Sequence, residues 1–352
     1  MSNIVLSSFS SRLVAWQRLH GRHDLPWQGE DAYRVWLSEI MLQQTQVATV
    51  LPYYQRFVAS FPSVAALAAA SQEQVLAHWS GLGYYARGRN LHRAAQLIAE
   101  KYHGEFPRRY EQILELPGIG RSTAAAICAL AYHERRAILD GNVKRVLARY
   151  CGIEGSPGDK AVENQLWLQA EALLPQRDVA SYIQAQMDMG ATLCTRGRPK
   201  CGECPVRADC IAFQTNRVHE LPTPRPRKAV PERHSTFLLL LHDSDILLEK
   251  RAPSGIWGGL WCPPQLEDGQ GVVADYLLHN GIALKERSEL TEFIHTFTHF
   301  KLHITPVLLR VAHKPLQAQQ PGSVWLNVND ALRVAIPTPV RKILGELLQN
   351  KA

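Results

Sequence analysis

The first candidate for chemistry in this 352-residue chain is a short glycine turn at residues 116–120, Leu-Pro-Gly-Ile-Gly. Its proline ends a preceding helix, and Gly118 and Gly120 can adopt positive φ and leave their backbone N–H groups uncovered. A helix is predicted from Arg121 to about Tyr132, and uncovered N–H groups at a helix N-terminus bind phosphate. The turn is therefore typical of a phosphate-binding site, although it could also simply join two core helices.

Asp140 is an isolated carboxylate a short distance after this turn. The sequence Asp140-Gly141-Asn142 is typical of a helix start, and the helix that follows carries Lys144 and Arg145. We expect Asp140 at a helix N-terminus, facing outward. The alternative is that Asp140 is a plain N-cap without a chemical role.

A second carboxylate, Glu39, lies in a largely apolar helical run at residues 35–47. Its neighbours Trp36, Leu37, Ile40 and Met41 should remove part of its water, which favours the protonated form of a carboxyl group. A neutral carboxyl group can act as an acid. The alternative is an exposed glutamate on an amphipathic helix.

Four of the seven cysteines form a tight cluster with spacings of six, two and five residues between them: Cys194, Cys201, Cys204 and Cys210. Four thiolates in so short a loop can surround one metal centre, and zinc and a [4Fe-4S] cluster both accept this ligand set. The other three cysteines show no paired spacing, which indicates a reducing compartment rather than a disulfide framework.

The charge of the chain favours a polyanionic partner. The 39 Lys and Arg residues exceed the 32 Asp and Glu residues, which gives a net charge of +7 and a pI near 9.1. Arg87 and Arg89 lie near predicted turns from which phosphates could be reached, although each by itself is more typical of a solvated charge. No apolar run is long enough to cross a bilayer, so we expect no membrane partner.

The composition changes after residue 211. Residues 216–231 are rich in Pro and Arg and predict an extended linker. Residues 235–241 and 245–250 then predict two β-strands around a turn, followed by a glycine-rich segment. The length of the chain and this change together predict a second, α+β domain at residues 232–352.

These motifs resemble those of the DNA glycosylase superfamily that includes endonuclease III and the MutY adenine glycosylases. The resemblance covers nearly the whole chain and is strongest at residues 25–47, 81–90, 116–149 and 194–210. It implies a mainly α-helical helix-hairpin-helix glycosylase domain at residues 1–215, in which loop 194–210 holds a [4Fe-4S] cluster. It also implies a Nudix-like C-terminal domain after the linker.

The resemblance assigns roles to both carboxylates. In the MutY family the glutamate at the position of Glu39 donates a proton to the adenine ring, and the aspartate at the position of Asp140 lies beside the sugar being cut. An ionised carboxylate there would stabilise the positive charge that builds on deoxyribose when the N-glycosidic bond breaks. Deprotonated Glu39 would then activate water, and no external cofactor is required for this hydrolysis.

Other residues are assigned to DNA and to the two bases by the same resemblance. A base inside a duplex is unreachable, so the enzyme should extrude adenine and fill the gap, with Gln44 and Tyr84 as the wedge. Thr298 and His299 match the loop that checks the opposite base for 8-oxoguanine, although many relatives have Ser in place of Thr298. The expected DNA-backbone contacts are Gly118, Gly120 and Lys144. The weaker candidates for the adenine pocket are Trp27, Gln28, Leu42 and Gln184. Tyr84 and Trp27 could instead be purely structural.

Ser122 decides between two reaction types. Endonuclease III-like enzymes have Lys at this position, whose amine forms a Schiff base with the sugar and permits strand cleavage, whereas a Ser hydroxyl has no such chemistry. We therefore expect a monofunctional glycosylase, with Ser122 hydrogen-bonded near Asp140. The alternative is a bifunctional endonuclease III-like enzyme for oxidised pyrimidines, in which Lys144 would be the first candidate for the amine.

The sequence thus predicts a monomeric base excision repair enzyme that removes adenine from double-stranded DNA containing A:8-oxoG or A:G mispairs. Its expected location is the bacterial cytoplasm, with the nucleoid. Two other functions are less compatible with the residues. A Nudix hydrolase needs a helix dense in Glu, whereas residues 270–285 offer Asp275 as their single acid. A non-catalytic DNA scanning protein would need neither Glu39 nor Asp140.

Overall fold

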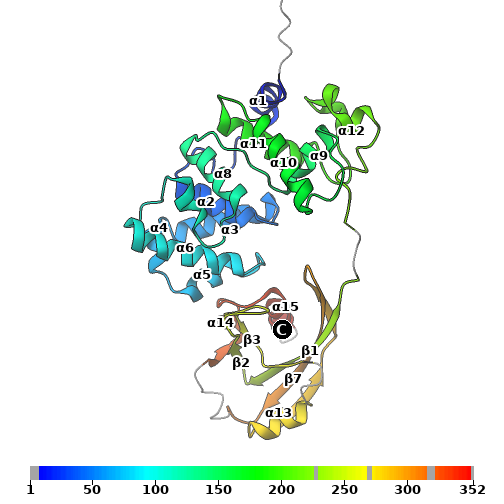
Figure 1. The fold of residues 1–352 in the computed structure, drawn as a ribbon. Helices are drawn as coiled ribbons and strands as arrows, with labels where there is room; N and C mark the ends of the chain where they lie inside the picture. Colours follow the sequence, from blue (N-terminus) through cyan, green and yellow to red (C-terminus); the bar gives the residue numbers. More distant parts are fainter. Residues whose placement is uncertain (1–7, 226–228, 268–271, 315–321, 350–352) are drawn as a thin grey trace, which may run out of the picture. The chain divides into compact units, whose positions relative to one another are not determined.

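The computed structural model describes residues 8–225, 229–267, 272–314 and 322–349. The chain forms two compact units, one of helices and one built around a β-sheet (Figure 1). The first unit comprises Met1–Ala68 and Arg93–Arg227, and the second comprises Ala69–His92 and Lys228–Ala352. The second unit thus includes a segment from the N-terminal half of the chain. The predicted domain boundaries at residues 215 and 232 stay a prediction.

The first unit consists of helices joined by short loops. Within the described ranges, none of the helices of the chain combines the length and the apolar character needed to cross a membrane. The elements of this unit are α1 (Phe9–His20), α2 (Ala32–Leu42), α3 (Val47–Ser60), α4 (Val64–Ala69), most of α6 (Ala86–Tyr102), α7 (Tyr110–Leu114), α8 (Arg121–Tyr132), α9 (Gly141–Tyr150), α10 (Lys160–Ala172), α11 (Val179–Thr192), the 3-10 turns η1 (Cys201–Glu203) and η2 (Arg207–Asp209), and α12 (Ile211–Gln214).

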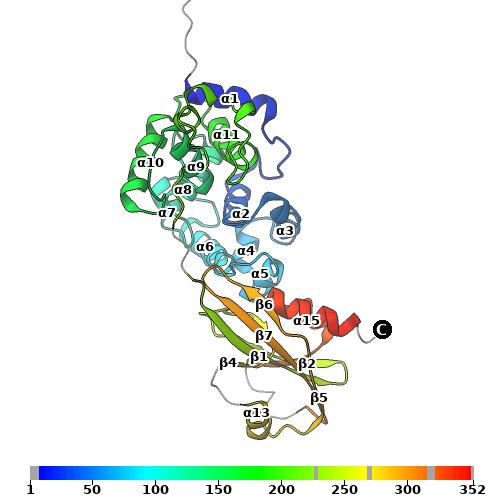
Figure 2. The ribbon, with the colours of Figure 1, turned by 90° about the vertical axis from the view of Figure 1, so that its right-hand side faces the viewer.

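Small side chains determine how the central helices of this unit pack. Helix α8 buries a run of alanines, and because they are small, α2 can pack closely along it, while α1 packs along α11 (Figure 2). The starts of α2 and α9 are set by Asp31 and Asp140, whose side chains accept hydrogen bonds from backbone N–H groups of the first turn. The helix predicted from Arg121 to Tyr132 and the helix start at Asp140 are both confirmed.

The second unit is built on a mixed β-sheet of eight strands within its described residues. Its central pair, β1 (Glu232–His242) and β7 (Lys301–Val311), is parallel, with Glu232 beside Lys301 and Leu241 beside Arg310. Strand β2 (Asp245–Lys250) is antiparallel to β1, so the two predicted strands of this domain are confirmed. The remaining strands are β3 (Trp261–Cys262), β4 (Gln265–Glu267), β5 (Leu284–Glu289), β6 (Phe293–Thr296) and β8 (Ser323–Asn327).

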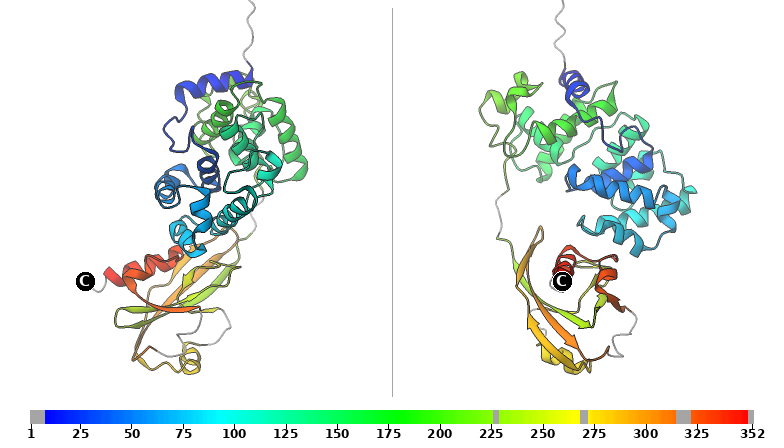
Figure 3. Two further views of the ribbon diagram at one scale, coloured as in Figure 1. Left: turned by 90° about the vertical axis from the view of Figure 1, so that its left-hand side faces the viewer. Right: turned by 180° about the vertical axis from the view of Figure 1, so that it is seen from behind.

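Both faces of the central strands are covered. Leu238 and Leu240 of β1 share a buried cluster with Val273 of α13 (Val273–His279), while the alternate residue Leu239 points to the other face. On that other face the sheet curves around α15 (Thr338–Gln349) (Figure 3). The continuous apolar run of β1 is thus explained by burial on both sides. Helices α5 (Gln72–Trp79) and α14 (Val328–Ala331), together with the start of α6, complete the unit.

Candidate active site

Glu39 lies on the last turns of α2, among residues that are almost completely buried. Trp36, Leu37, Ile40 and Met41 are each at most 2 % exposed, and Glu39 itself is half-buried. This burial, together with the nearby negative charge of Asp140, raises the pKa of the Glu39 carboxyl from its ordinary value of 4.5 to about 8. The predicted partial desolvation of Glu39 agrees with the structure, and its role as the acid stays a prediction.

Asp140 is the N-cap of α9 and is half-buried rather than facing outward, so the prediction about its exposure was wrong. Burial raises the pKa of Asp140, but the N–H groups of Val143 and Asn142 and the cations Arg145 and Lys144 oppose this shift. The Val143 N–H donates to Asp140 Oδ1 at 2.7 Å. The cap places the carboxyl group over the helix N-terminus, and the packing around it excludes water, which sequence spacing does not reveal.

The two carboxyl groups differ in what stabilises their charge. Asp140 receives backbone hydrogen bonds and lies at the positive end of a helix dipole, whereas burial and the charge of Asp140 both disfavour ionisation of Glu39. When one proton is held by such a pair, it therefore resides on Glu39. The arrangement provides an acid and a nearby carboxylate at neutral pH.

The glycine turn has the predicted shape at one of its two glycines. Gly118 has a φ of +82°, whereas Gly120 is the N-cap of α8 with an extended φ of −102°, so positive φ at Gly120 was a wrong expectation. Gln43 follows the last residue of α2. Its side-chain Nε2 donates to the carbonyl oxygen of Gly118 at 3.4 Å and to Thr123 Oγ1 at 3.5 Å. The helix that carries Glu39 is thereby tied to the turn.

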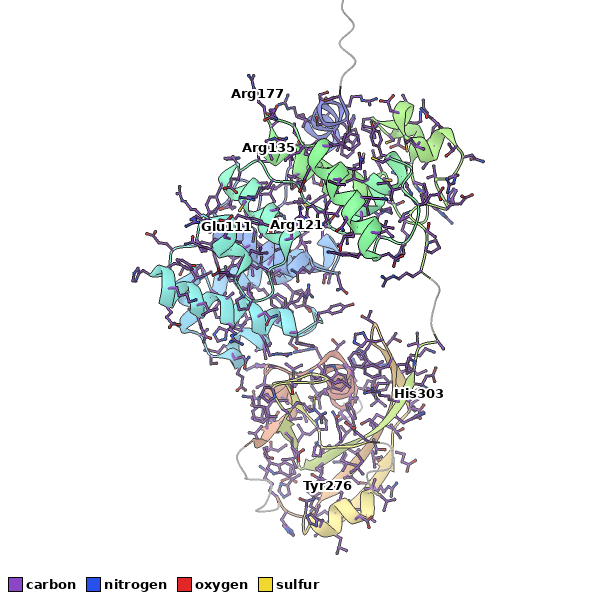
Figure 4. The ribbon with its side chains drawn as sticks, in the orientation of Figure 1. Glu111, Arg121, Arg135, Arg177, Tyr276 and His303 are labelled. Atoms are coloured by element: carbon purple, nitrogen blue, oxygen red, sulfur yellow. The ribbon has the colours of Figure 1, made fainter. Side chains whose placement is uncertain are left out.

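Ser122 Oγ accepts a hydrogen bond of 2.9 Å from the backbone N–H of Leu139, the residue before Asp140. The predicted hydrogen bond of Ser122 near Asp140 is confirmed. Ser122 also lines an open cavity of about 350 Å³, whose other lining residues are Gly120, Arg121, Thr123, Leu139, Lys160, Glu163 and Trp167. Arg121, labelled in Figure 4, stacks over Trp167 at 3.7 Å and pairs with Glu171.

Lys144, expected at the DNA backbone, is engaged within the protein. Its Nζ pairs with Glu163 Oε1 at 2.7 Å, and burial leaves less than a quarter of the side chain exposed. This pair must open, or be shared, before Lys144 can contact a phosphate or a sugar.

The adenine-pocket candidates fall into two groups. Gln28 and Gln184 are connected through Arg22, because Gln28 Nε2 donates to the Arg22 carbonyl oxygen at 2.8 Å and Gln184 Nε2 donates to Asp188 Oδ1 at 2.8 Å. Asp188 is completely buried and accepts from both the backbone N–H and the guanidinium Nε of Arg22.

The other two candidates behave differently from this network. Trp27 is only 5 % exposed and its ring meets Tyr54 edge to face at 5.1 Å, which places it in the core. Leu42 is half-buried at the C-terminal end of α2. The roles of all four residues toward adenine stay predictions.

The two wedge candidates share an uncommon backbone conformation. Gln44 in the first unit and Tyr84 in the second have φ values of +56° and +49°, a left-handed region that side chains larger than Gly rarely occupy. Both side chains are exposed. Such strain persists only where the surrounding structure holds it, and it concentrates at functional positions.

The Tyr84 turn is held from within by Trp79 and Arg87. Trp79 Nε1 donates to the carbonyl oxygen of Gly83 at 3.1 Å, and Arg87 Nη2 donates to the same oxygen at 3.2 Å. The Arg87 guanidinium lies 5.4 Å from the centre of the Tyr84 ring, and burial lowers its pKa to about 10. Arg87 is thus a buried scaffold residue rather than the solvated charge that its position in the sequence favoured.

The recognition-loop candidates lie in the turn between β6 and β7 and are exposed. The rings of Phe297 and Phe300 stack at 4.4 Å and close this turn, with the Phe297 N–H donating to the Phe300 carbonyl oxygen. Thr298 Oγ1 lies 2.9 Å from the hydroxyl of Tyr84 within the second unit. The structure thus brings one wedge candidate and the recognition-loop candidate Thr298 together.

The four clustered cysteines line one cavity of the first unit, together with the basic residues Arg149, Lys200 and Arg207 and mostly apolar side chains. Within the described residues, no three His, Cys, Asp or Glu side chains are close enough to hold a single metal ion. Four thiols around a shared cavity fit a [4Fe-4S] cluster, in which each iron takes one thiolate, better than one zinc ion.

Arginines from α9 fix the cysteine loop. Arg149 is 3 % exposed, and its guanidinium donates to the carbonyl oxygens of Thr195 at 2.7 Å and Leu221 at 2.8 Å, and lies 3.3 Å from Cys194 Sγ. Arg145 donates to the Cys194 carbonyl oxygen at 2.8 Å and to Asn142 Oδ1 at 2.8 Å. One helix therefore carries Asp140 at its start and the supports of the cysteine loop along its length.

Sequence reasoning missed several residues of this site. Arg22, Asp188, Gln43 and Arg149 have no motif of their own, because their partners lie far away in the chain. The one available signal was that Asp188 and Arg149 are charged residues within apolar helical faces, which favours a buried, paired charge.

Comparisons with known proteins agree with this geometry. A family model of HhH-GPD superfamily base excision DNA repair proteins matches residues 37–171, the iron-sulfur binding domain of endonuclease III matches residues 194–210, and a NUDIX domain matches residues 236–346. An adenine DNA glycosylase from Buchnera aphidicola (subsp. Acyrthosiphon pisum) is 38 % identical over 97 % of this chain and 98 % of its own. The human adenine DNA glycosylase is 33 % identical over 96 % of this chain and 73 % of its own.

Solved structures show the same fold in the helical part. A thermostable thymine-DNA glycosylase superposes with a TM-score of 0.53 and 27 % identity, covering 59 % of this chain and 95 % of that one. An endonuclease III bound to DNA superposes with a TM-score of 0.50 and 20 % identity, covering 59 % and 94 %. The predicted fold class and the predicted [4Fe-4S] cofactor are confirmed.

Replacing Glu39 with Gln is expected to stabilise the free protein as pH rises. The carboxyl of Glu39 keeps its proton up to about pH 8 when folded but loses it near 4.5 when unfolded, so wild-type stability falls across that window. Gln carries no such proton, and because solvent screens the half-buried carboxyl of wild type, the variant should gain only on the order of 2 kcal/mol over wild type between about pH 5 and about pH 8. Denaturant unfolding at both pH values measures this, with exposed Glu100→Gln as control. If the free energies of unfolding of Glu39→Gln and wild type differed by the same amount at both pH values, the burial of Glu39 would be contradicted.

Replacing Arg149 with Met should loosen the cysteine loop. The substitution leaves buried carbonyl oxygens of the loop without a donor, at a cost of roughly 2–4 kcal/mol. We expect less iron per purified chain and faster loss of the visible cluster absorbance in air. Arg198→Met, an exposed position in the same loop, is the matched control. Equal iron content and decay in both variants would show that Arg149 does not support the cluster.

Proposed function

The chain belongs to the adenine DNA glycosylase family, and we propose that its substrate is adenine mispaired with 8-oxoguanine or guanine in double-stranded DNA. It is a base excision repair enzyme that hydrolyses the N-glycosidic bond of adenine, and it carries a [4Fe-4S] cluster.

The observation that carries the mechanism is the unequal carboxyl pair. Glu39 retains its proton near neutral pH because it is buried and because Asp140 is close, while Asp140 is stabilised as an anion by the N-terminus of α9. Two neighbouring carboxyl groups with separated proton affinities provide an acid and a charge stabiliser side by side.

The reaction that we propose proceeds in two steps. The Glu39 proton moves to the adenine ring, the bond between the sugar and the base breaks, and its electron pair leaves with adenine. Ionised Asp140 stabilises the positive charge on the sugar. The Glu39 carboxylate then takes a proton from water as the water oxygen bonds to the sugar, which leaves an abasic site and restores protonated Glu39.

We propose that the enzyme is monofunctional. Ser122 offers no amine, and its hydroxyl oxygen already accepts the Leu139 N–H. The Lys144 Nζ is paired with Glu163, so this ion pair would have to open before the amine could reach the sugar. These contacts support hydrolysis over the endonuclease III-like alternative, which no comparison favours.

The proposed recognition step uses exposed residues on strained backbone. Extruding adenine leaves a gap in the duplex, and Gln44 and Tyr84 would fill it, since both present exposed side chains from left-handed turns. Thr298 and His299 would inspect the opposite base. The contact of Tyr84 with Thr298 supports a shared role, because the two groups can reach neighbouring base positions from one place.

The adenine pocket would be shaped by the network of Gln28, Arg22, Asp188 and Gln184. Amide and guanidinium groups that are at least partly buried are suited to reading the ring nitrogens of a purine, and the paired charge of Asp188 keeps Arg22 in a fixed direction. Gly118 and the N-terminus of α8 would hold phosphates of the DNA backbone.

The rival functions have less support. The C-terminal domain matches a NUDIX family, but α13, which is described in full, contains Asp275 as its single acid, so this helix does not supply the several carboxylates that would bind a divalent ion for pyrophosphate hydrolysis. A recognition role fits this domain better. We further propose that the protein acts as a monomer in a reducing bacterial cytoplasm, in association with the DNA of the nucleoid.

Single-turnover base release tests this function directly. Duplexes with adenine opposite 8-oxoguanine, adenine opposite guanine, and thymine glycol opposite adenine are incubated with excess enzyme, with and without alkali. We expect strand breaks at adenine after alkali alone, and Glu39→Gln should slow release by roughly 100- to 10,000-fold while DNA binding is kept. Cutting at thymine glycol without alkali would contradict both the substrate and the assignment of Ser122.

A further inference from the structure

Within the second unit, Tyr84 and Thr298 belong to a closed ring of contacts. Five residues after Tyr84, Arg89 Nη1 donates to the carbonyl oxygen of Gly258 at 2.8 Å. The ring of the adjacent Trp257 packs against Phe297 at 5.5 Å, and Phe297 precedes Thr298. The hydrogen bond between the hydroxyls of Tyr84 and Thr298 closes the ring.

The link at Gly258 is rigid because its backbone is packed without free space. A Cβ atom at Gly258 would lie 2.5 Å from the carbonyl oxygen of Pro253. The preceding Trp257 is held at a φ of +54° and is almost completely buried. A hydrogen bond to this carbonyl oxygen therefore fixes the start of α6 to a part of the sheet domain that cannot move by itself.

The opposite side of the Tyr84 turn is fastened as well. Ser80 donates to the carbonyl oxygen of Ile336 at 2.6 Å and accepts from Arg341 Nη2 at 3.0 Å. Before it on α5, Glu73 accepts from Lys250 at 2.9 Å and from Trp261 Nε1 at 2.6 Å. The turn that presents Tyr84 is thus anchored to the sheet domain on both of its sides.

Arg89 is the link in this ring that is best suited to a test. Its side chain is partly buried, and burial lowers its pKa. An arginine that only contacts phosphate at the surface would not need to bury its guanidinium. The desolvation of the Arg89 guanidinium is better explained by its bond to Gly258, which fixes the position of the Tyr84 turn.

We propose that Arg89 is a positioning residue that sets Tyr84 against Thr298 and thereby determines how strongly the enzyme prefers 8-oxoguanine over guanine opposite adenine. This inference rests on the proposed function, because it assumes that Thr298 reads the opposite base. Arg89 does not contact the reacting atoms; it acts through the Gly258 segment and the Tyr84 turn.

The test is the ratio of single-turnover rate constants for adenine opposite 8-oxoguanine and adenine opposite guanine, measured with the full-length protein. Arg89→Ala should lower this ratio about tenfold, as expected for loss of a charged hydrogen-bond donor. Arg89→Lys keeps a donor and a charge, and should restore most of the ratio. Arg93→Ala removes a cation one turn further along α6 from an exposed position, so any effect should be common to both duplexes and leave the ratio unchanged.

A double variant separates positioning from a general loss of structure. In a Thr298→Ala background, Arg89→Ala should lower the ratio no further, because the group that it positions is already absent. Trp257→Phe breaks the ring of contacts at another point, and should lower the ratio without adding to Arg89→Ala. This milder variant keeps the test available if Arg89→Ala folds poorly.

The outcomes distinguish the positioning role of Arg89 from the proposed recognition of the opposite base by Thr298. A Thr298→Ala ratio equal to wild type would overturn the proposed recognition and the inference with it. A lowered ratio for Thr298→Ala with an unchanged ratio for Arg89→Ala would overturn the inference alone. Equal slowing of both duplexes by Arg89→Ala, or a further fall of the ratio in the double variant, would also overturn it.

Discussion

The mechanism depends on one constraint, which is that two neighbouring and poorly solvated carboxyl groups cannot both ionise easily near neutral pH. Burial raises the proton affinity of Glu39 and Asp140 alike, and only Asp140 has backbone N–H groups and nearby cations to offset it. The fold creates this inequality, since Glu39 lies along the side of α2 and Asp140 caps the start of α9. Packing of α2 along the small side chains of α8 supplies the low polarity.

Buried arginines recur as the means by which this protein fixes irregular backbone. Arg149 holds the cysteine loop, Arg87 holds the Tyr84 turn, and Arg22 is itself held by Asp188. Each guanidinium satisfies several carbonyl or carboxylate oxygens from one rigid group, which a lysine could not do. Loops that must approach DNA or a cluster cannot use regular secondary structure, so their carbonyl oxygens need such donors.

Local patterns made much of this structure predictable from the sequence. The helix after the glycine turn, the helix start at Asp140 and the strands β1 and β2 were all predicted, because each depends on neighbouring residues. The desolvation of Glu39 could also be predicted, since its apolar neighbours are adjacent in the chain. Family resemblance added the cluster and the reaction. The spacing of the residues alone did not distinguish zinc from an iron-sulfur cluster, nor one of the two reaction types from the other.

The contacts between distant residues could not be predicted. The outward orientation expected for Asp140 and the solvated charge expected for Arg87 were both wrong, because burial depends on helices that lie far away in sequence. Positive φ at Gly120 was wrong because the residue caps α8 in an extended conformation. Arg89 likewise gives no sequence signal for its bond to Gly258, since the partner is a backbone carbonyl oxygen 169 positions later.

The pH dependence of single-turnover adenine release tests the carboxyl pair most directly. The rate constant is followed on the duplex with adenine opposite 8-oxoguanine, under conditions in which all DNA is bound. If Glu39 is the acid, the rate constant should be steady near neutral pH and fall by about tenfold for each unit above a pKa near 8. A rate constant that stays level well above that pH, in a protein that remains folded, would contradict the central role given to Glu39.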